Sequence, residues 1–135
     1  MANYTARTRS NYFRVKDPAA FEAWCERRDL EFWTETIDGL GPCYAVTADT
    51  GDCAGWSRYD PETDEPCDLP AELADHLLST DVAILMEIGN VKLRYLHAHA
   101  TAIAADGKTV SVQLGDIYDK AAAAFPGLTI TEARC

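Results

Sequence analysis

The stretch Val82–Ile88 (VAILMEI) is the most apolar part of the chain and decides the expected fold. A short apolar run of this kind, followed by the turn-forming pair Gly89-Asn90, is typical of a strand at the centre of a sheet. Val91–Ala105 continues with strand-forming residues but is too long for an ordinary strand. We therefore expect a bend or a bulge within it.

Downstream of this stretch, the sequence predicts a hairpin and a short helix. Asp106-Gly107 is a strong two-residue hairpin signal, and apolar side chains alternate after it, from Val110 to Leu114. We expect Asp116 to cap a helix over Ile117–Phe125. Leu128–Thr131 forms either a last edge strand or a loose tail.

Upstream, strand and helix signals alternate. Asn11–Val15 is aromatic and β-branched, which predicts a short strand. Asp17-Pro18 places an N-cap and a proline at the start of a helix that is expected to run to Arg28. Leu30–Ile37 and Cys43–Ala48 are predicted to pair as a hairpin around a turn that contains glycine and proline.

The region between this hairpin and the apolar stretch is acidic. Cys53–Ser57 is a candidate for another short strand, and Arg58–Asp68 (RYDPETDEPCD) predicts an exposed loop interrupted by prolines. Leucines then recur at helical spacing over Leu69–Leu77. This pattern predicts an amphipathic helix with Asp68 as its cap.

Hairpins dominate this order of elements, so we expect an α+β fold: a two-layer sandwich of a mostly antiparallel sheet with helices on one face. A split ferredoxin-like arrangement stays open. The length of 135 residues favours a single domain, residues 1–135. The positions expected to be largely buried are Trp24, Leu73, Leu77, Ile84, Leu85 and Val112.

Charge is distributed unevenly along the chain, whose net charge is −10. Residues 1–16 carry only basic charges, whereas residues 17–90 hold 18 acidic residues against three basic ones. Such a surface repels nucleic acids and membranes and attracts basic partners. We therefore expect no direct nucleic-acid binding, no membrane association and a partner with a basic surface. We expect the basic N-terminus to pair with the protein's own acidic surface, either within one protomer or across a homodimer, and both alternatives stay open.

Five cysteines without a Cys-x-x-Cys pair, and a polar N-terminus without an apolar signal core, indicate reduced thiols in a cytoplasmic protein. Cys43, Cys53, Cys67 and His76 are the set considered for zinc. Their spacing matches no standard zinc knuckle. We expect neither a metal ion nor a cofactor.

Acidic residues of the middle region are the candidate binding residues. They are Asp49, Asp52, Asp60, Glu62, Asp64, Glu65 and Asp68. A calcium loop needs oxygen ligands at alternating positions around a central glycine, and Pro61 and Pro66 interrupt this segment. We expect a docking surface for a basic protein rather than a metal site.

His97 and His99 lie two residues apart on an expected strand, so both point to one face of the sheet. They are either ordinary sheet residues or a site for metal binding or acid/base chemistry, and both alternatives stay open. The sequence contains no nucleophile elbow, phosphate-binding loop or dinucleotide fingerprint. No catalytic residue is assigned, and we expect a protein that is not an enzyme.

Two segments, SNYFRVKD (Ser10–Asp17) and DVAILMEIGNVKLRYLHAHATAI (Asp81–Ile103), resemble a family of small acidic accessory proteins carried by phages and plasmids. Phe21 and Trp24 match the helix anchors that follow the first segment in that family, and Ile84–Tyr95 matches its later pair of strands. The acidic middle region is covered poorly. The resemblance implies a mobile-element setting, in which small acidic proteins often inhibit host defence, as anti-CRISPR and anti-restriction proteins do. It carries over no catalytic residue.

We therefore expect a non-enzymatic protein that binds and inhibits a host nucleic-acid-handling defence complex, with an acidic surface that takes the place of nucleic acid. Two alternatives stay open. One is a small metal-dependent enzyme that uses His97 and His99. The other is a plasmid or phage maintenance protein without an inhibitory role.

Overall fold

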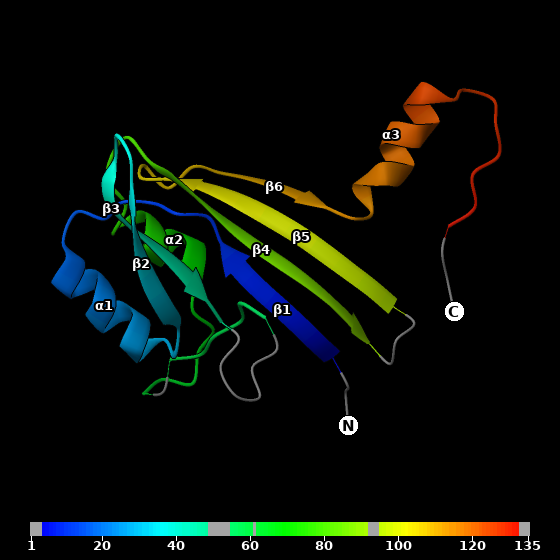
Figure 1. Ribbon diagram of the computed structural model, residues 1–135. Coiled ribbons are helices and arrows are strands. Elements are labelled where there is room, and N and C mark those ends of the chain that lie inside the picture. The colour runs from blue at the N-terminus through cyan, green and yellow to red at the C-terminus, as the bar shows by residue number, and fades with distance from the viewer. Residues whose placement is uncertain (1–3, 49–54, 61, 92–94, 133–135) are drawn as a thin grey trace.

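The computed structural model describes residues 4–48, 55–60, 62–91 and 95–132. Within these ranges the chain forms six strands and three helices (Figure 1). In chain order they are β1 (Tyr4–Ser10), α1 (Pro18–Arg27), β2 (Glu31–Ile37), β3 (Gly41–Thr47), α2 (Leu69–Ala74), β4 (Val82–Val91), β5 (Tyr95–Ala104), β6 (Thr109–Gln113) and α3 (Asp116–Ala124). All strand pairs are antiparallel, which confirms the predicted α+β class.

The apolar stretch that decides the fold forms most of β4, and β4 lies inside a four-stranded sheet with the order β1-β4-β5-β6. Because successive side chains of a strand point to opposite faces, β4 divides its residues between two faces. Ala83, Leu85 and Glu87 are buried and define the core face of the sheet, whereas Met86 and Ile88 are exposed and define its outer face.

The hairpin β2-β3 forms a separate two-stranded sheet. Side chains of β1 take the place of a backbone ladder between the two sheets. Thr8 Oγ1 accepts a hydrogen bond from the backbone N–H of Ala48 at 2.7 Å. Ser10 Oγ accepts one from the backbone N–H of Val46 at 2.8 Å. Thr8 and Ser10 are buried, so these hydroxyls satisfy backbone groups that would otherwise lack a partner.

Helices α1 and α2 begin where the sequence predicts. The Asp17 carboxylate accepts a hydrogen bond from the third residue of α1 at 3.3 Å, and the Asp68 carboxylate does the same in α2 at 3.2 Å. A proline in the first turn follows each cap. Helix α2 ends at Ala74, earlier than the leucine pattern suggests, although Leu77 beyond it is still buried.

Aromatic side chains join α1, the hairpin and the core face. The Phe21 ring centroid lies 4.8 Å from that of Tyr44 and 5.7 Å from that of Phe13. Ile103 of β5 belongs to the same buried cluster. The core therefore lies between the core face of the sheet and the layer that contains α1, α2 and the hairpin (Figure 1).

Four of the six predicted core positions are buried: Trp24, Leu73, Leu77 and Leu85. The other two predictions are wrong. Ile84 is half-buried, and Val112 is 51% exposed. Both side chains point to the outer face, because each lies one position away in its strand from residues of the core face.

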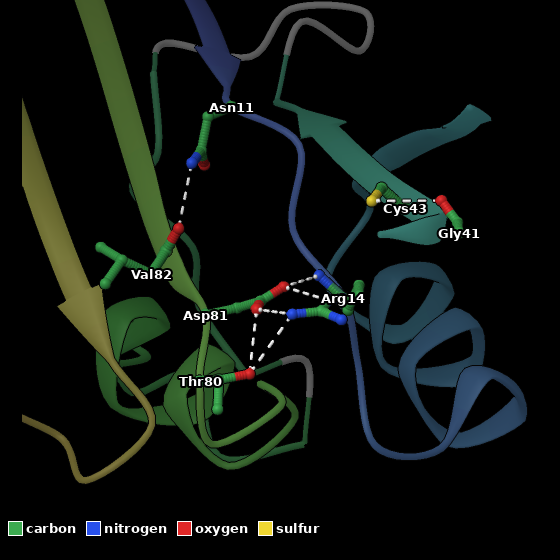
Figure 2. Close-up of polar contacts among 7 residues, drawn as sticks. All are labelled: Asn11, Arg14, Gly41, Cys43, Thr80, Asp81 and Val82. Atoms are coloured by element: carbon green, nitrogen blue, oxygen red, sulfur yellow. Dashed lines mark hydrogen bonds and ion pairs between the residues drawn. The ribbon is translucent and has the colours of Figure 1, made fainter. Parts of the chain in front are cut away.

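The strand predicted over Asn11–Val15 is wrong in position, because β1 ends at Ser10. Asn11 contacts β4 through both its backbone and its side chain. Its backbone N–H donates to the Ile84 carbonyl at 3.2 Å. Its side-chain amide donates to the Val82 carbonyl at 3.0 Å (Figure 2), and its Oδ1 accepts from the Ile84 N–H at 2.7 Å. The rest of the segment makes isolated bridges rather than a strand. A side chain that mimics a backbone partner ends a strand in this way.

An ion pair fixes this connector to the start of β4 (Figure 2). Arg14 Nη2 lies 2.7 Å from Asp81 Oδ1, and the backbone N–H of Arg14 donates to Asp81 Oδ2 at 2.7 Å. The side-chain hydrogen bond from Arg14 is the main cause that holds the pKa of Asp81 below its ordinary value.

The turn predicted at Gly89-Asn90 is wrong, because β4 continues to Val91. Gly89 pairs on both sides, with Ala6 of β1 and His97 of β5, and two ladders hold it in the strand. The bend or bulge expected in the following segment is also absent from its described part. Strand β5 begins at Tyr95 and pairs with β4 one residue to one.

A hairpin forms at Asp106-Gly107 as predicted, but its loop is longer than the expected two residues, because β5 ends at Ala104 and β6 begins at Thr109. Gly107 has a positive φ of 92°, and its N–H donates to the Ala104 carbonyl at 2.9 Å. The predicted helix follows as α3, but Gly115 rather than Asp116 holds the N-cap position. The Asp116 carboxylate instead accepts from the Gln113 N–H at 2.8 Å.

Two short segments do not form the strands considered for them. Gly55 and Trp56 form a turn, so the described part of Cys53–Ser57 contains no strand. Leu128–Thr131 also lies outside any strand. Helix α3 buries none of its residues and stands away from the rest of the fold (Figure 1).

Candidate functional site

We call the described part of Arg58–Asp68, residues 58–60 and 62–68, the acidic loop; it lies between the turn at Trp56 and α2. The backbone N–H of Asp60 donates to the Glu65 carbonyl at 2.8 Å, and that of Asp64 donates back to the Asp60 carbonyl at 2.8 Å. Asp60 Oδ1 also accepts from the Glu62 N–H at 2.8 Å. These bonds fix the backbone that carries the acidic side chains.

Two arginines attach the acidic loop to the core. Arg58 Nε donates to the Arg28 carbonyl at 2.8 Å, and Arg58 Nη2 donates to the Ala48 carbonyl at 3.2 Å. Arg28 in turn lies 3.7 Å from Asp60 Oδ2 and 2.8 Å from Glu72 Oε1. Arg58 and Arg28 therefore connect the acidic loop to the core, Arg58 through backbone carbonyls and Arg28 through the carboxylates of Asp60 and Glu72.

The contacts with Arg28 and with backbone N–H groups determine the pKa values of Glu72 and Asp60. Partial burial raises the pKa of Glu72, but hydrogen bonds from Arg28 and Trp24 outweigh it and leave the pKa below its ordinary value. The pKa of Asp60 is also lowered, mainly by the hydrogen bond from the Glu62 backbone N–H. Both carboxylates are ionised at neutral pH.

Of the predicted binding residues, Glu62, Asp64 and Glu65 are exposed. Within the described ranges, none of their carboxylates forms an ion pair. Asp60 and Asp68 instead have structural contacts, with Arg28 and with the first turn of α2. Asp49 and Asp52 lie outside the described residues. The structure thus brings the Asp60–Asp68 part of the predicted site into one loop.

A separate group of polar side chains lies on the core face. It contains His97 and His99, which the sequence places on one strand, and Glu87 from the neighbouring strand. Glu87 of β4 pairs with His99 of β5, and His97 lies two residues away on the same face. His97 Nε2 lies 2.8 Å from His99 Nδ1 and 3.4 Å from Glu87 Oε2. We call these residues the Glu87–His97–His99 cluster.

The turn before the acidic loop holds the carboxylate of this cluster. Glu87 Oε1 accepts a hydrogen bond from the Trp56 backbone N–H at 2.9 Å. Gly55 allows this close approach: it has φ 86°, and a Cβ on it would lie 2.1 Å from the same oxygen. Trp56 is fixed as well, because its indole N–H donates to the Met86 carbonyl at 3.0 Å.

Beside the cluster lies a cavity of about 180 Å³. Its lining residues are Trp56, Ser57, Cys67, Leu69, Pro70, Leu85, Glu87, His99 and Thr101. Burial changes steeply across the cluster, because the Glu87 side chain is 8% exposed and the His97 side chain is 44% exposed. The cluster therefore lies at the boundary between the core and solvent.

The set considered for zinc does not assemble among the described residues. Cys43 is buried on β3, and Cys67 lines the cavity beside the cluster. His76 packs against the Trp24 ring with centroids 5.3 Å apart, and burial lowers its pKa. In the part of the chain that the structure describes, only the Glu87–His97–His99 cluster brings three ligand atoms within 4.8 Å of one another. Cys53 lies outside the described residues.

The outer face of the sheet is apolar and exposed. Its large exposed side chains are Val82, Met86, Ile88, Leu96, Val110 and Val112. Ile117 of α3 and Phe125, which directly follows that helix, are further apolar side chains and are both 56% exposed. A contiguous apolar surface of this kind marks an interaction site in soluble proteins.

No family model matches the chain, and neither a curated protein nor a solved structure is significantly similar to it. The resemblance to accessory proteins of phages and plasmids therefore stays a prediction. Among the described residues, no helix is both long and apolar enough to cross a membrane.

Proposed function

We propose that this protein binds a basic surface of another protein through the acidic loop, without enzymatic activity. The observation that carries this proposal is the arrangement of Glu62, Asp64 and Glu65, which are exposed on a backbone held by its own hydrogen bonds and by Arg58. A loop that is ordered before binding loses less conformational entropy when it docks.

The proposed partner is a host nucleic-acid-handling defence complex, of the restriction or CRISPR type, which the protein inhibits. Such complexes use lysine and arginine channels, and phosphate contacts supply much of their affinity for nucleic acid. Clustered carboxylates on a chain with a net charge of −10 are attracted to the same channels. Occupation of a channel by the acidic loop would exclude the nucleic acid.

Charge reversal in the loop tests this proposal. The variant Glu62→Lys/Glu65→Lys should weaken binding to a purified restriction or CRISPR effector complex, measured by biolayer interferometry. Glu35→Lys/Glu132→Lys is the matched control, because it makes the same change of net charge at two exposed positions outside the acidic loop. Equal weakening by both variants would show that net charge, rather than the loop, determines binding.

We also propose that the outer face of the sheet is covered by a second copy of the chain. Its strands β4, β5 and β6 place no acidic side chain on this face, although the chain as a whole is strongly acidic. The basic residues Arg7 and Arg9 of β1 lie on the same face, opposite Ile88 and Met86. Two copies that meet at β4, β5 and β6 would therefore bring no carboxylates of these strands together.

Helix α3 supplies complementary chemistry for this contact. It buries none of its residues in its own chain, and the apolar residues Ile117 within it and Phe125 directly after it are exposed. It also carries Asp116 and Asp119, whose charges are opposite to those beside the outer face. A homodimer in which each copy covers the other's outer face would bury both surfaces.

A further inference from the structure

We propose that the Glu87–His97–His99 cluster binds a divalent transition-metal ion, with zinc as the metal that fits its ligands best. Two imidazoles and one carboxylate form a ligand set that zinc uses in proteins. Three protein ligands leave at least one coordination position open for water or a small ligand. This site is separate from the acidic loop, and the proposal does not depend on the proposed function.

Distances between the ligand atoms support the proposal. Two ligands of a tetrahedral zinc ion, each about 2.0–2.1 Å from the metal, lie roughly 3.3 Å apart. Here His97 Nε2 lies 2.8 Å from His99 Nδ1 and 3.4 Å from Glu87 Oε2. Small adjustments of the exposed His97 ring and the half-buried His99 ring would bring all three atoms to metal-binding distance.

The Glu87 carboxylate is oriented before any metal binds. The Trp56 backbone N–H holds Oε1 at 2.9 Å, while Oε2 faces the His97 ring. Hydrogen bonds of this type, from outside the ligand set, fix ligand orientation in metal sites. The glycine at position 55 permits this contact, because a Cβ there would lie 2.1 Å from Oε1.

A cation would also suit the charges and the space at this position. The Glu87 carboxylate is 8% exposed, and a bound cation would offset its charge at the boundary of the core. The cavity of about 180 Å³ is lined by both Glu87 and His99, so it leaves room for a water molecule or a small anion beside the metal.

Isothermal titration of the metal-free, reduced full-length chain with zinc chloride tests this site. We expect one equivalent of zinc to bind to the wild type. His97→Ala/His99→Ala should lose affinity by more than about 100-fold, which is beyond the effect of changing a residue outside the ligand set. The fold is checked by circular dichroism, and it should be retained because His97 is exposed and His99 is half-buried.

Thiols are the competing ligands, so a second measurement separates them. Cobalt(II) gives an intense near-ultraviolet charge-transfer band when a cysteine binds it, and the proposed site should give only weak visible bands. Cys67→Ser is the matched control, because Cys67 lines the same cavity without belonging to the cluster. It should retain one equivalent of zinc.

Three results would overturn the proposal. The first is a wild type that binds no zinc at micromolar concentrations. The second is full zinc affinity in His97→Ala/His99→Ala. The third is a thiolate band that disappears in Cys67→Ser together with zinc binding. Glu87→Gln provides an independent check, because it keeps the shape of the side chain and should still weaken zinc binding.

Discussion

The two faces of the β1-β4-β5-β6 sheet differ in what covers them rather than in how apolar they are. On the core face, Leu85 is 4% exposed and packs in the buried cluster. On the outer face, the adjacent residue Met86 is 42% exposed. An antiparallel sheet that faces water usually alternates apolar and polar residues, and β4 does not. This difference is the reason for proposing that a second copy of the chain covers the outer face.

The core face also changes character along its length. Where the core face is covered, it consists of apolar side chains such as Ile103. Where it reaches solvent, it carries the Glu87–His97–His99 cluster. Polar residues with defined contacts thus occur where the core face reaches solvent. The outer face has no comparable group on β4, β5 or β6 within the described ranges.

The largest expected effect is the loss of core packing. Leu85→Ala should lower the free energy of unfolding by about 2–5 kcal/mol, because it leaves a cavity in the buried cluster. In a monomer, Met86→Ala should cost less than about 0.5–1 kcal/mol. Urea unfolding of both variants measures the comparison. A concentration-dependent cost for Met86→Ala would show that a second copy covers it, and equal costs in a dilute monomer would contradict the assignment of faces.

Substitutions that introduce charged side chains on the outer face should dissociate the proposed dimer. Val110→Asp/Val112→Asp should weaken self-association by at least about 100-fold, because two carboxylates would be buried at the interface. Thr109→Asp/Ser111→Asp is the matched control on the opposite side of β6. Sedimentation velocity measures both. A wild type that stays monomeric at all concentrations would remove the dimer.

The Arg14–Asp81 pair should make stability depend on pH. The pKa of Asp81 is lowered in the folded chain, so its contribution is present above the unfolded pKa of about 3.9 and is lost as pH falls through the folded value. Asp81→Asn should therefore lower the urea midpoint at neutral pH and make little difference in strong acid. A difference that stays constant with pH would show that the charge of Asp81 does not matter.

The smallest expected effect on stability is at the open end of the core face. His97→Ala should change the free energy of unfolding by no more than about 0.5 kcal/mol, because its side chain is 44% exposed and lies at the boundary with solvent. Urea unfolding without metal measures it. If zinc binds at the cluster, saturating zinc should raise the midpoint of the wild type but not that of His97→Ala/His99→Ala. A large loss of stability without metal would make His97 a structural residue.

Local signals in the sequence were sufficient for several elements. Asp17-Pro18 and Asp68 predicted the helix starts because capping depends on a few adjacent residues. Asp106-Gly107 predicted the last hairpin for the same reason. Strand β1 was missed because its residues, YTARTRS, are polar and lack a strand pattern, and its pairing with β4 spans most of the chain.

The two candidate sites also differ in how far the sequence alone can predict them. The Asp60–Asp68 part of the acidic loop is contiguous in sequence, so composition was enough to predict it. The Glu87–His97–His99 cluster depends on the register of β4 and β5, which places Glu87 opposite His99. The available signal was a single acid inside an apolar strand, followed by His-x-His. This signal predicts a three-residue cluster only when the pairing of β4 with β5 is known.

The most direct test of the proposed function is displacement of a fluorescent DNA duplex from a purified restriction or CRISPR effector complex across a salt series. At low salt, the wild type and Glu35→Lys/Glu132→Lys should displace the duplex stoichiometrically, and Glu62→Lys/Glu65→Lys should not. The difference between the loop variant and the wild type should shrink at high salt, because screening shortens the reach of exposed charges. Equal displacement by the loop variant and the wild type at low salt would contradict a role for the acidic loop.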